Sequence, residues 1–282
     1  MASPSKAVLI TGCSSGIGHA TATRLVQDGW KVYATARRPE ALADLSEKGA
    51  STLALDVTDE DSMRAAVDAV AAAEGAVGVL VNNAGYSQSG AVESVAIDQI
   101  RKQFETNVFG LVRMCQLVLP GMRSQSWGKI VNISSMGGRL TFPGGGVYHA
   151  TKYAVEALSD ALRFEVRGFG VDVIVVEPGL IVTNFGEVAS ASVDRSQGDG
   201  AYAEFNRKVA QLTENAYKGP MAKLGSGPEA VAGTIARALR SSHPKSRYPV
   251  TPSAHLMINQ RRIVPDRLWD LMMRTQFPTP RA

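Results

Sequence analysis

Cysteine, aromatic residues and long apolar runs are all scarce in this chain. Two cysteines, Cys13 and Cys115, are too few for a disulfide framework or a thiolate zinc site, so we expect a reduced intracellular protein without a metal. Aromatic residues make up only 6% of the 282 residues. No segment reaches about 18 consecutive apolar residues, and the N-terminus lacks the apolar core of a signal peptide. These absences exclude a disulfide-rich secreted domain and a helical membrane protein, and they predict a cytoplasmic location.

Positive charge is concentrated near the C-terminus. The chain has 30 Lys and Arg against 26 Asp and Glu, a formal net charge of +4. Nine basic residues and two aspartates fall between Arg237 and Ala282, which gives this segment a charge of +7. We interpret it as a solvated rim around a C-terminal helix and expect no nucleic-acid partner. The alternative is a lipid-binding segment over residues 252–282, which is rich in Leu, Trp and Met as well as basic.

Short apolar runs alternate with longer amphipathic stretches over the first 180 residues. The runs predict strands at Ala7–Ile10, Lys31–Ala36, Thr52–Asp56, Val77–Val81, Gly128–Ser134 and Val171–Glu177. The stretches predict helices at His19–Asp28, Pro39–Lys48, Asp59–Glu74, Asp98–Met122 and Tyr148–Gly168. Strands that are apolar throughout are typical of a parallel sheet buried on both faces. The pattern therefore predicts an α/β Rossmann fold, a doubly wound parallel sheet with helices on both faces.

The alternation weakens after the sixth strand. Residues 184–227 are small and polar, so we expect a substrate loop with one or two short helices there. Its larger side chains either line an apolar cleft or pack on the helices beneath; they are Val188, Val193, Tyr202, Phe205 and Leu212. A helix near Pro228–Arg240 and a short strand near Arg247–Val250 precede a C-terminal extension, about residues 250–282, in which Pro265 begins a helix. No linker interrupts the chain, so residues 1–282 are predicted to form a single domain.

A glycine-rich turn follows the first predicted strand. Gly12, Gly16 and Gly18 permit a tight turn and bring the backbone close to a pyrophosphate at the next helix N-terminus. The second strand ends in Ala36-Arg37-Arg38, without the acidic residue that an NAD site usually has there. Ala36 leaves room for a 2′-phosphate, and a guanidinium group is shaped to bind one. The turn and the strand end predict NADP(H), unless the two arginines are only solvated charges.

A tyrosine and a lysine four residues apart indicate proton transfer. Tyr148 and Lys152 lie on one face of the predicted helix. A tyrosine with its ordinary pKa of about 10 is a poor base at neutral pH, but a neighbouring ammonium group favours the phenolate and lowers that pKa. Ser135 lies thirteen residues before Tyr148, at the end of a strand beside the predicted cofactor crevice. We therefore predict an acid–base pair here, and we interpret the nearby His149 and Cys13 as structural.

Together these motifs resemble the short-chain dehydrogenase/reductase family, in its single-domain branch. The likeness covers about residues 5–185 and rests on TGCSSGIG, LDV, NNAG, Asn107, NISS, YHATK and PGLIVT, in the family's order. It implies a catalytic tetrad of Asn107, Ser135, Tyr148 and Lys152. With the turn and strand above, it assigns cofactor binding to Gly12, Ser14, Ser15, Gly16, Ile17, Gly18, Arg37, Arg38, Asp56, Val57, Asn83, Ala84, Gly85, Tyr148, Lys152, Pro178, Gly179, Ile181 and Thr183.

The resemblance also implies a reaction. Hydride moves between the nicotinamide and a carbonyl carbon, while Tyr148 transfers the proton and Ser135 fixes the substrate oxygen. Lys152 is implied to bind the nicotinamide ribose and support the phenolate, and Asn107 to hold a water. Family members often form dimers through their long helices, here Asp98–Met122 and Tyr148–Gly168, so we expect a homodimer.

The substrate is less narrowly defined by the sequence. TGCSSGIG, KVYATAR and the tail beyond Pro249 most resemble the hydroxysteroid and retinol dehydrogenase subgroup, which implies a bulky apolar ketone, aldehyde or alcohol. One alternative is 3-oxoacyl-thioester reduction, in which Arg261, Arg262 or Arg267 engages a phosphopantetheine or a carrier partner. Another is a non-catalytic NADP-binding protein, against which the intact tetrad argues.

Overall fold

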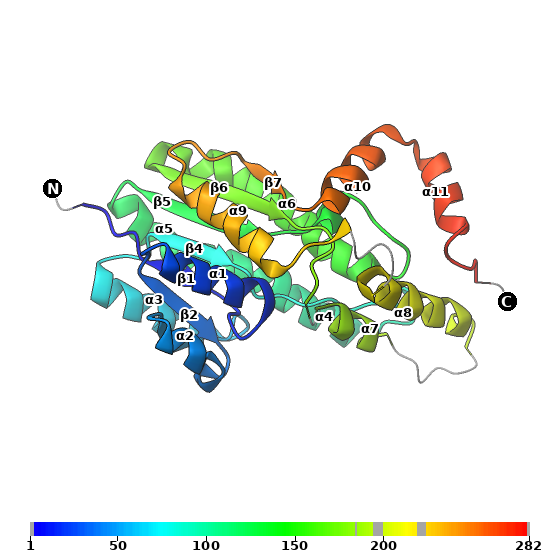
Figure 1. The fold of residues 1–282 in the computed structure, drawn as a ribbon, viewed down its shortest axis with the longest axis horizontal. Helices are drawn as coiled ribbons and strands as arrows, with labels where there is room; N and C mark the ends of the chain where they lie inside the picture. Colours follow the sequence, from blue (N-terminus) through cyan, green and yellow to red (C-terminus); the bar gives the residue numbers. More distant parts are fainter. Residues whose placement is uncertain (1–2, 184, 194–199, 219–223, 281–282) are drawn as a thin grey trace.

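The strands of the computed structural model form one parallel sheet of seven strands (Figure 1). The structure describes residues 3–183, 185–193, 200–218 and 224–280. The strands are β1 (Val8–Ile10), β2 (Val32–Ala36), β3 (Ser51–Ala54), β4 (Val79–Asn82), β5 (Gly128–Ile133), β6 (Val171–Glu177) and β7 (Arg247–Pro249). Their order is β3-β2-β1-β4-β5-β6-β7, with every neighbouring pair parallel. The order reverses between β1 and β4, which creates the crevice where a doubly wound fold binds its ligand.

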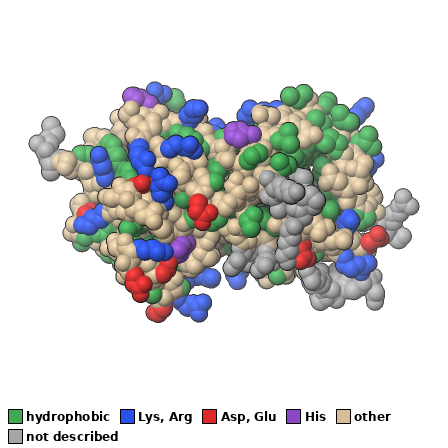
Figure 2. All heavy atoms as spheres, in the orientation of Figure 1, with side chains coloured by type: hydrophobic (Ala, Val, Ile, Leu, Met, Phe, Trp, Pro, Cys, Tyr) green, Lys and Arg blue, Asp and Glu red, His purple; other side chains and the backbone are tan. Residues whose placement is uncertain are grey.

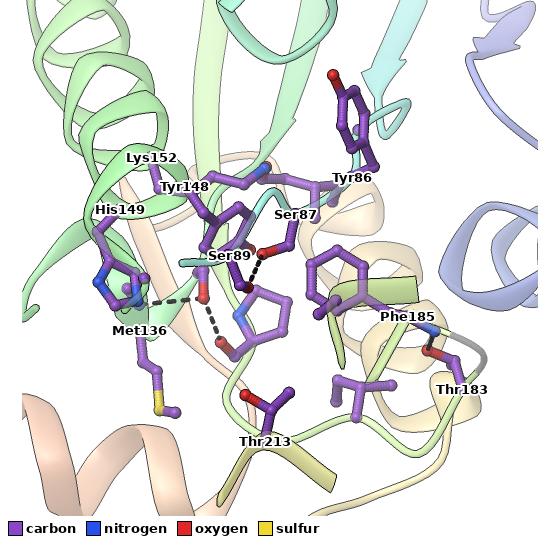
Figure 3. Close-up of a pocket in the computed structure, with 18 of the residues that line it drawn as sticks. Tyr86, Ser87, Ser89, Met136, Tyr148, His149, Lys152, Thr183, Phe185 and Thr213 are labelled. Atoms are coloured by element: carbon purple, nitrogen blue, oxygen red, sulfur yellow. Dashed lines mark hydrogen bonds between the residues drawn. The ribbon is translucent and has the colours of Figure 1, made fainter. Parts of the chain in front are cut away.

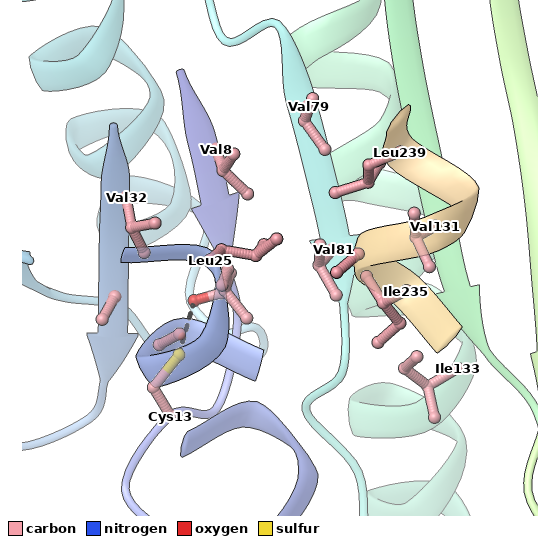
Figure 4. Close-up of a cluster of buried hydrophobic side chains, with 14 of the residues drawn as sticks. Val8, Cys13, Leu25, Val32, Val79, Val81, Val131, Ile133, Ile235 and Leu239 are labelled. Atoms are coloured by element: carbon pink, nitrogen blue, oxygen red, sulfur yellow. Dashed lines mark hydrogen bonds between the residues drawn. The ribbon is translucent and has the colours of Figure 1, made fainter. Parts of the chain in front are cut away.

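Helices cover both faces of this sheet, as the sequence predicts. One face carries α1 (Gly16–Gln27), α2 (Ala43–Glu47) and α9 (Pro228–Arg240), and the other carries α3 (Glu60–Glu74), α5 (Gly110–Ser124) and α6 (Gly146–Val166). Figure 4 shows Leu25 of α1 against β1 and β2, and Ile235 and Leu239 of α9 against β4 and β5. The central strands are buried on both faces, so they show no apolar–polar alternation, although β5 also buries the polar side chains of Lys129 and Asn132.

The observed elements differ from the predicted ones mainly at their ends. β3 ends at Ala54, so Asp56 lies in the turn that follows and not on the strand. The helix predicted over Asp98–Met122 is α4 (Ile97–Phe104), then a π-helical turn (Glu105–Phe109), then α5. A π turn inserts an extra residue that hydrophobic periodicity does not reveal, and such turns are frequent at functional sites. α6 begins at Gly146, so Tyr148 falls within its first turn.

The helices after β6, apart from α9, gather beyond the carboxyl ends of the strands (Figure 1). The predicted substrate loop contains α7 (Phe185–Ala191) and α8 (Ala203–Lys218); position 184 and residues 194–199 and 219–223 lie outside the described residues. The C-terminal extension contains α10 (Pro252–Ile263) and α11 (Asp266–Arg274), and Pro265 precedes α11 as its cap instead of being its first residue. No helix in the described part of the chain is long and apolar enough to cross a membrane.

The apolar residues of the substrate loop divide between the two predicted environments. Val193 and Phe205 are buried and pack with Tyr202 and Phe277 in a small cluster. Leu212 instead lines a large cavity. The side chain of Val188 lies outside the described part of the structure. The loop is therefore anchored by its own apolar side chains and presents only part of them to a ligand.

Candidate active site

The turn after β1 is shaped by its glycines. Gly12 has a φ of +72° and Gly16 a φ of +59°, a backbone region that other residues rarely adopt. A Cβ added to Gly18 would collide with the carbonyl oxygen of Gly12, so only glycine lets α1 begin this close to β1. The first turn of α1 holds no acidic side chain, and its cap residue Ser15 makes no side-chain hydrogen bond to it. The backbone N–H groups of this turn are therefore suited to bind an anion.

Two polar side chains join the ends of β1 and β4. Asn83 Nδ2 donates to the carbonyl oxygens of Thr11 and Gly12, both at 2.9 Å. Thr11 Oγ1 accepts from the backbone N–H groups of Asn83 and Ala84, both at 3.0 Å. A Cβ added to Gly12 would lie 3.0 Å from the Cα of Ala84. The two loops are thus held in contact at the point where the strand order reverses.

Small and basic residues lie at the carboxyl end of β2. Ala36 is buried, Arg37 is exposed, and both line the large cavity. Asp56 lines it as well, but one of its carboxylate oxygens already accepts from the backbone N–H of Thr58 at 2.9 Å and from its hydroxyl at 2.7 Å. A guanidinium group at this edge of the cavity is suited to bind a phosphate group.

Tyr148 and Lys152 lie at one wall of the same cavity (Figure 3), and Ser135, which also lines it, is a hydrogen-bond partner of Tyr148. Ser135 Oγ accepts from the backbone N–H of Gly137 at 3.0 Å and donates to a backbone carbonyl oxygen after β6 at 3.4 Å. Lys152 Nζ donates to the last carbonyl oxygen of β5 at 2.8 Å and lies 5.7 Å from the centroid of the Tyr148 ring. The spacing of four residues along α6 therefore does place the amine beside the phenol.

Burial sets the protonation states of this pair. It raises the pKa of Tyr148 above its ordinary range, although the hydrogen bond with Ser135 acts in the opposite direction. It lowers the pKa of Lys152 to about 8, an effect that the negative charge of Glu156 opposes. The sequence predicts a lowered pKa for Tyr148, whereas in the packed structure desolvation of the phenol raises it. At neutral pH Tyr148 holds its proton and can act as a proton donor.

Asn107 lies on the π turn and is 2% exposed. Its Nδ2 donates to the carbonyl oxygen of Tyr86 at 2.9 Å and to Thr151 Oγ1 at 3.1 Å. Its Oδ1 accepts from the backbone N–H of Tyr86 at 3.1 Å. The side chain therefore ties the loop after β4 to α6, one residue before Lys152, and each of its polar atoms has a protein partner.

The glycine turn, the end of β2 and the wall with Tyr148 all border one cavity of about 1320 Å³. An ordinary small-molecule site is smaller, roughly 300–1,000 Å³. Among the predicted cofactor residues only Gly18 and Arg38 do not line this cavity: Gly18 packs on the turn, and Arg38 precedes a 3₁₀ turn (Pro39–Leu42). Most of its apolar lining was not predicted, and comprises Met136, Phe142, Phe185, Ala189, Val209, Tyr217, Met257, Met272, Met273 and Phe277. These residues carry no motif, and only the fold brings them to the site.

The two residues interpreted as structural have different surroundings. Cys13 is fully buried in the apolar core, and burial raises its pKa to about 12, so it is an unreactive filler. His149 lines the cavity, where its Nδ1 accepts from the backbone N–H of Phe142 at 3.2 Å. Burial lowers the pKa of His149 to about 4, so it is neutral at physiological pH. It contributes an uncharged polar edge to the apolar part of the cavity.

Comparison with known proteins identifies the family. A family model described as short chain dehydrogenase matches residues 6–193, which include every motif residue described above. The chain belongs to the short-chain dehydrogenase family. Its oxidoreductase chemistry follows from that membership, and the Rossmann fold and the sequence resemblance are both confirmed.

Several relatives in this family match almost end to end. The 3-ketodihydrosphingosine reductase of Bacteroides thetaiotaomicron is 34% identical, with 95% of this chain and 96% of that protein covered. The NADPH-dependent 3-dehydrocapnine reductase of Ornithobacterium rhinotracheale is also 34% identical, with 93% and 94% covered. The crystal structure of a short-chain dehydrogenase from Streptomyces avermitilis is similar at a TM-score of 0.78 and 33% identity, over 96% of this chain and 97% of that one.

Proposed function

We propose that this dehydrogenase uses NADP(H) to transfer hydride to or from a lipophilic carbonyl or alcohol, such as a steroid-, retinoid- or long-chain-like ketone or aldehyde. One observation carries the proposal: the protonated Tyr148, with Ser135 and Lys152, lies where the dinucleotide part of the cavity meets its apolar part. The names of the two reductase relatives support both NADPH and the reductive direction.

The residues of the cavity fit an NADP-type dinucleotide. The positive φ values of Gly12 and Gly16 keep the turn open, and the N-terminus of α1 faces the pyrophosphate position. Arg37 and the exposed Ser14 and Ser15 supply donors for a 2′-phosphate, with no acidic side chain at the end of β2 to repel it. When bound, the dinucleotide would supply or accept the hydride.

The chain's own residues act on the substrate oxygen. The hydroxyl groups of Ser135 and Tyr148 donate hydrogen bonds to a carbonyl oxygen and so polarise it. As that oxygen gains negative charge, Tyr148 gives up its proton. The ammonium group of Lys152, 5.7 Å from the ring centroid, stabilises the phenolate that remains. Asn107 acts as a positioning residue because it fixes the loop after β4 beside this helix.

The lining of the substrate end favours an uncharged, apolar molecule. Of the described lining residues, the charged ones are Arg37, Asp56, Lys102, Glu105 and Lys152, and none belongs to the helices α7, α8, α10 or α11. A 3-oxoacyl thioester of a phosphopantetheine carrier brings a phosphate group, for which the described side chains of these helices offer no cation in the large cavity. The apolar ketone is therefore the better supported of the two substrates.

An assay that follows the oxidation of NADPH in the presence of candidate substrates tests the proposal. We expect turnover with hydrophobic ketones, weaker turnover with acetoacetyl thioesters, and weaker use of NADH. Tyr148→Phe should lower kcat by roughly 10²–10⁴-fold, while NADPH binding followed by fluorescence is kept. Tyr153→Phe, an exposed tyrosine on the same helix, is the matched control and should keep full turnover. Full activity of Tyr148→Phe would remove the proposed proton donor.

A homodimer is part of the same proposal. Exposed apolar side chains are spread over the helical surfaces expected to form the interface, with Phe109 55% exposed and Phe164 86% exposed. Burial of such side chains drives association. Light scattering should give twice the chain mass, and Phe164→Ser should shift the protein toward the monomer.

A further inference from the structure

The outer side of the C-terminal extension carries four exposed apolar side chains. Leu256 and Ile263 of α10 are 57% and 81% exposed, and Leu268 and Leu271 of α11 are 49% and 57% exposed. A spacing of seven residues on α10 and of three on α11 places each pair on one helix face. Figure 2 shows hydrophobic and basic side chains together at the end of the molecule that these helices form.

The apolar sector of α11 is wider than its contact with the rest of the protein. Trp269 and Met273 are buried beside Leu140, and they complete the contact with α10. Leu268 and Leu271 extend the same sector into solvent. An amphipathic helix with such an uncovered apolar strip and a charged opposite face is typical of helices that lie in a membrane interface.

A small cavity beside these side chains is lined by arginines. It measures about 250 Å³, lies between α6 and α10, and is lined by Arg139, Tyr153, Ile258, Arg261 and Arg262. Arg261 is paired with Asp266, and Arg139 lies 3.8 Å from the carboxylates of Glu156 and Glu177. Within the described residues Arg262 is exposed and forms no ion pair. Three guanidinium groups around one recess are suited to hydrogen-bond a phosphate group.

We propose that α10 and α11 dock this enzyme on a membrane that contains anionic phospholipid. The four exposed apolar side chains enter the interface, and the arginine-lined cavity receives lipid phosphate groups. Over residues 252–274, which include both helices, four arginines against two aspartates give a charge of +2, which complements such a surface. The inner sides of the same helices line the large cavity through Met257 and Met272, so an apolar ketone could pass from the bilayer to Tyr148 without crossing water. The docking itself needs no turnover and is tested separately from the proposed function.

Sedimentation with sucrose-loaded vesicles tests the docking on the full-length protein. We expect binding to vesicles of phosphatidylcholine mixed with phosphatidylglycerol, weaker binding at high salt, and little binding to phosphatidylcholine alone. Arg262→Glu should lower the partition coefficient by about fivefold or more. The double variant Leu268→Ser with Leu271→Ser should lower it by about tenfold or more, since apolar side chains leave the interface.

Two matched variants serve as controls. Arg167→Glu makes the same charge change on an exposed arginine at the far end of α6, and Ile97→Ser removes a 58% exposed apolar side chain from α4. Both should bind vesicles as the wild type does, and melting temperatures should show that all variants fold. Three results would overturn the proposal: no binding to anionic vesicles, equal losses in the controls, or a wild-type dimer that the Leu268→Ser and Leu271→Ser changes dissociate. In the last case a second copy of the chain covers this surface.

Discussion

Lys152→Met should raise the stability of the fold while abolishing turnover. Burial lowers the pKa of Lys152 from 10.5 to about 8. One pKa unit corresponds to about 1.4 kcal/mol, so the buried ammonium group lowers the free energy of unfolding by about 3 kcal/mol at pH 7. Methionine leaves the carbonyl oxygen of Ile133 without the donor that now lies 2.8 Å away. The loss of this hydrogen bond reduces the gain in the free energy of unfolding by about 1 kcal/mol. A net gain of about 2 kcal/mol predicts a rise in melting temperature of about 5 °C.

The gain should depend on pH. The folded-state pKa of Lys152 lies below its unfolded value, so between pH 8 and 10.5 the unfolded wild type binds more protons than the folded one. The stability contribution of this group therefore rises with pH across that window, and the variant has no such rise. The difference between the two proteins should be largest below pH 8, should nearly vanish at about pH 10 and should reverse slightly above it, because the loss of the hydrogen bond to Ile133 remains.

Thermal unfolding at pH 7 and at pH 10, followed by circular dichroism, measures both effects. Lys129→Met is the control, because Lys129 is also buried and burial also lowers its pKa. Lys129 lies away from the cavity, where its Nζ donates to the carbonyl oxygen of Leu239 at 3.0 Å. Turnover should be lost in the first variant and kept in the second. A Lys152→Met protein that melts below the wild type at pH 7, or by the same difference at both pH values, would refute this reasoning.

Three further predictions concern the cofactor site and the buried carboxylates. Arg37→Asp should weaken NADPH binding by about tenfold or more and leave NADH binding nearly unchanged; an unaltered ratio of the two dissociation constants would show that the guanidinium does not contact the 2′-phosphate. Gly16→Ala and Gly29→Ala should each lower the free energy of unfolding by about 1–2 kcal/mol, because both glycines have positive φ. Only Gly16 lines the cavity, so only Gly16→Ala should bind NADPH more weakly in titrations. Burial and the charge of Glu156 raise the pKa of Glu177. The wild type therefore loses stability as the pH rises above the ordinary glutamate pKa. Glu177→Gln should be stabilising at pH 8 and neutral at pH 4 in denaturant titrations.

The part of the site that could be predicted from sequence is the part that local geometry determines. The carboxyl ends of parallel strands meet at one edge of the sheet, so a glycine turn after β1 and a serine after β5 must lie near each other. Tyr148 and Lys152 share a helix face because they are four residues apart. These rules need no knowledge of packing, and the positions of Gly12, Ser135, Tyr148 and Lys152 follow from them.

The rest depends on contacts between distant segments. Met257 and Met272 line the cavity more than 100 residues after Tyr148 in the chain, and no spacing rule connects them. The π turn at Asn107 is a one-residue irregularity that does not disturb the apolar pattern of the helix. The pKa of Tyr148 could not be predicted either, because burial raises it and only the packed structure shows that the phenol is buried.

The charge of Lys152 is balanced from behind the site and not from the substrate side. Glu156 lies one helical turn after Lys152, is 5% exposed, and accepts from Arg247 Nε at 3.0 Å. Arg247 also donates to Asp160 at 2.6 Å, so this residue of β7 is tied to two turns of α6. Because α10 follows β7 directly, the ion pairs that neutralise the carboxylates behind Lys152 also hold the C-terminal extension beside the cavity. The position of the extension is thus set by the same buried charges that surround the proton-transfer pair.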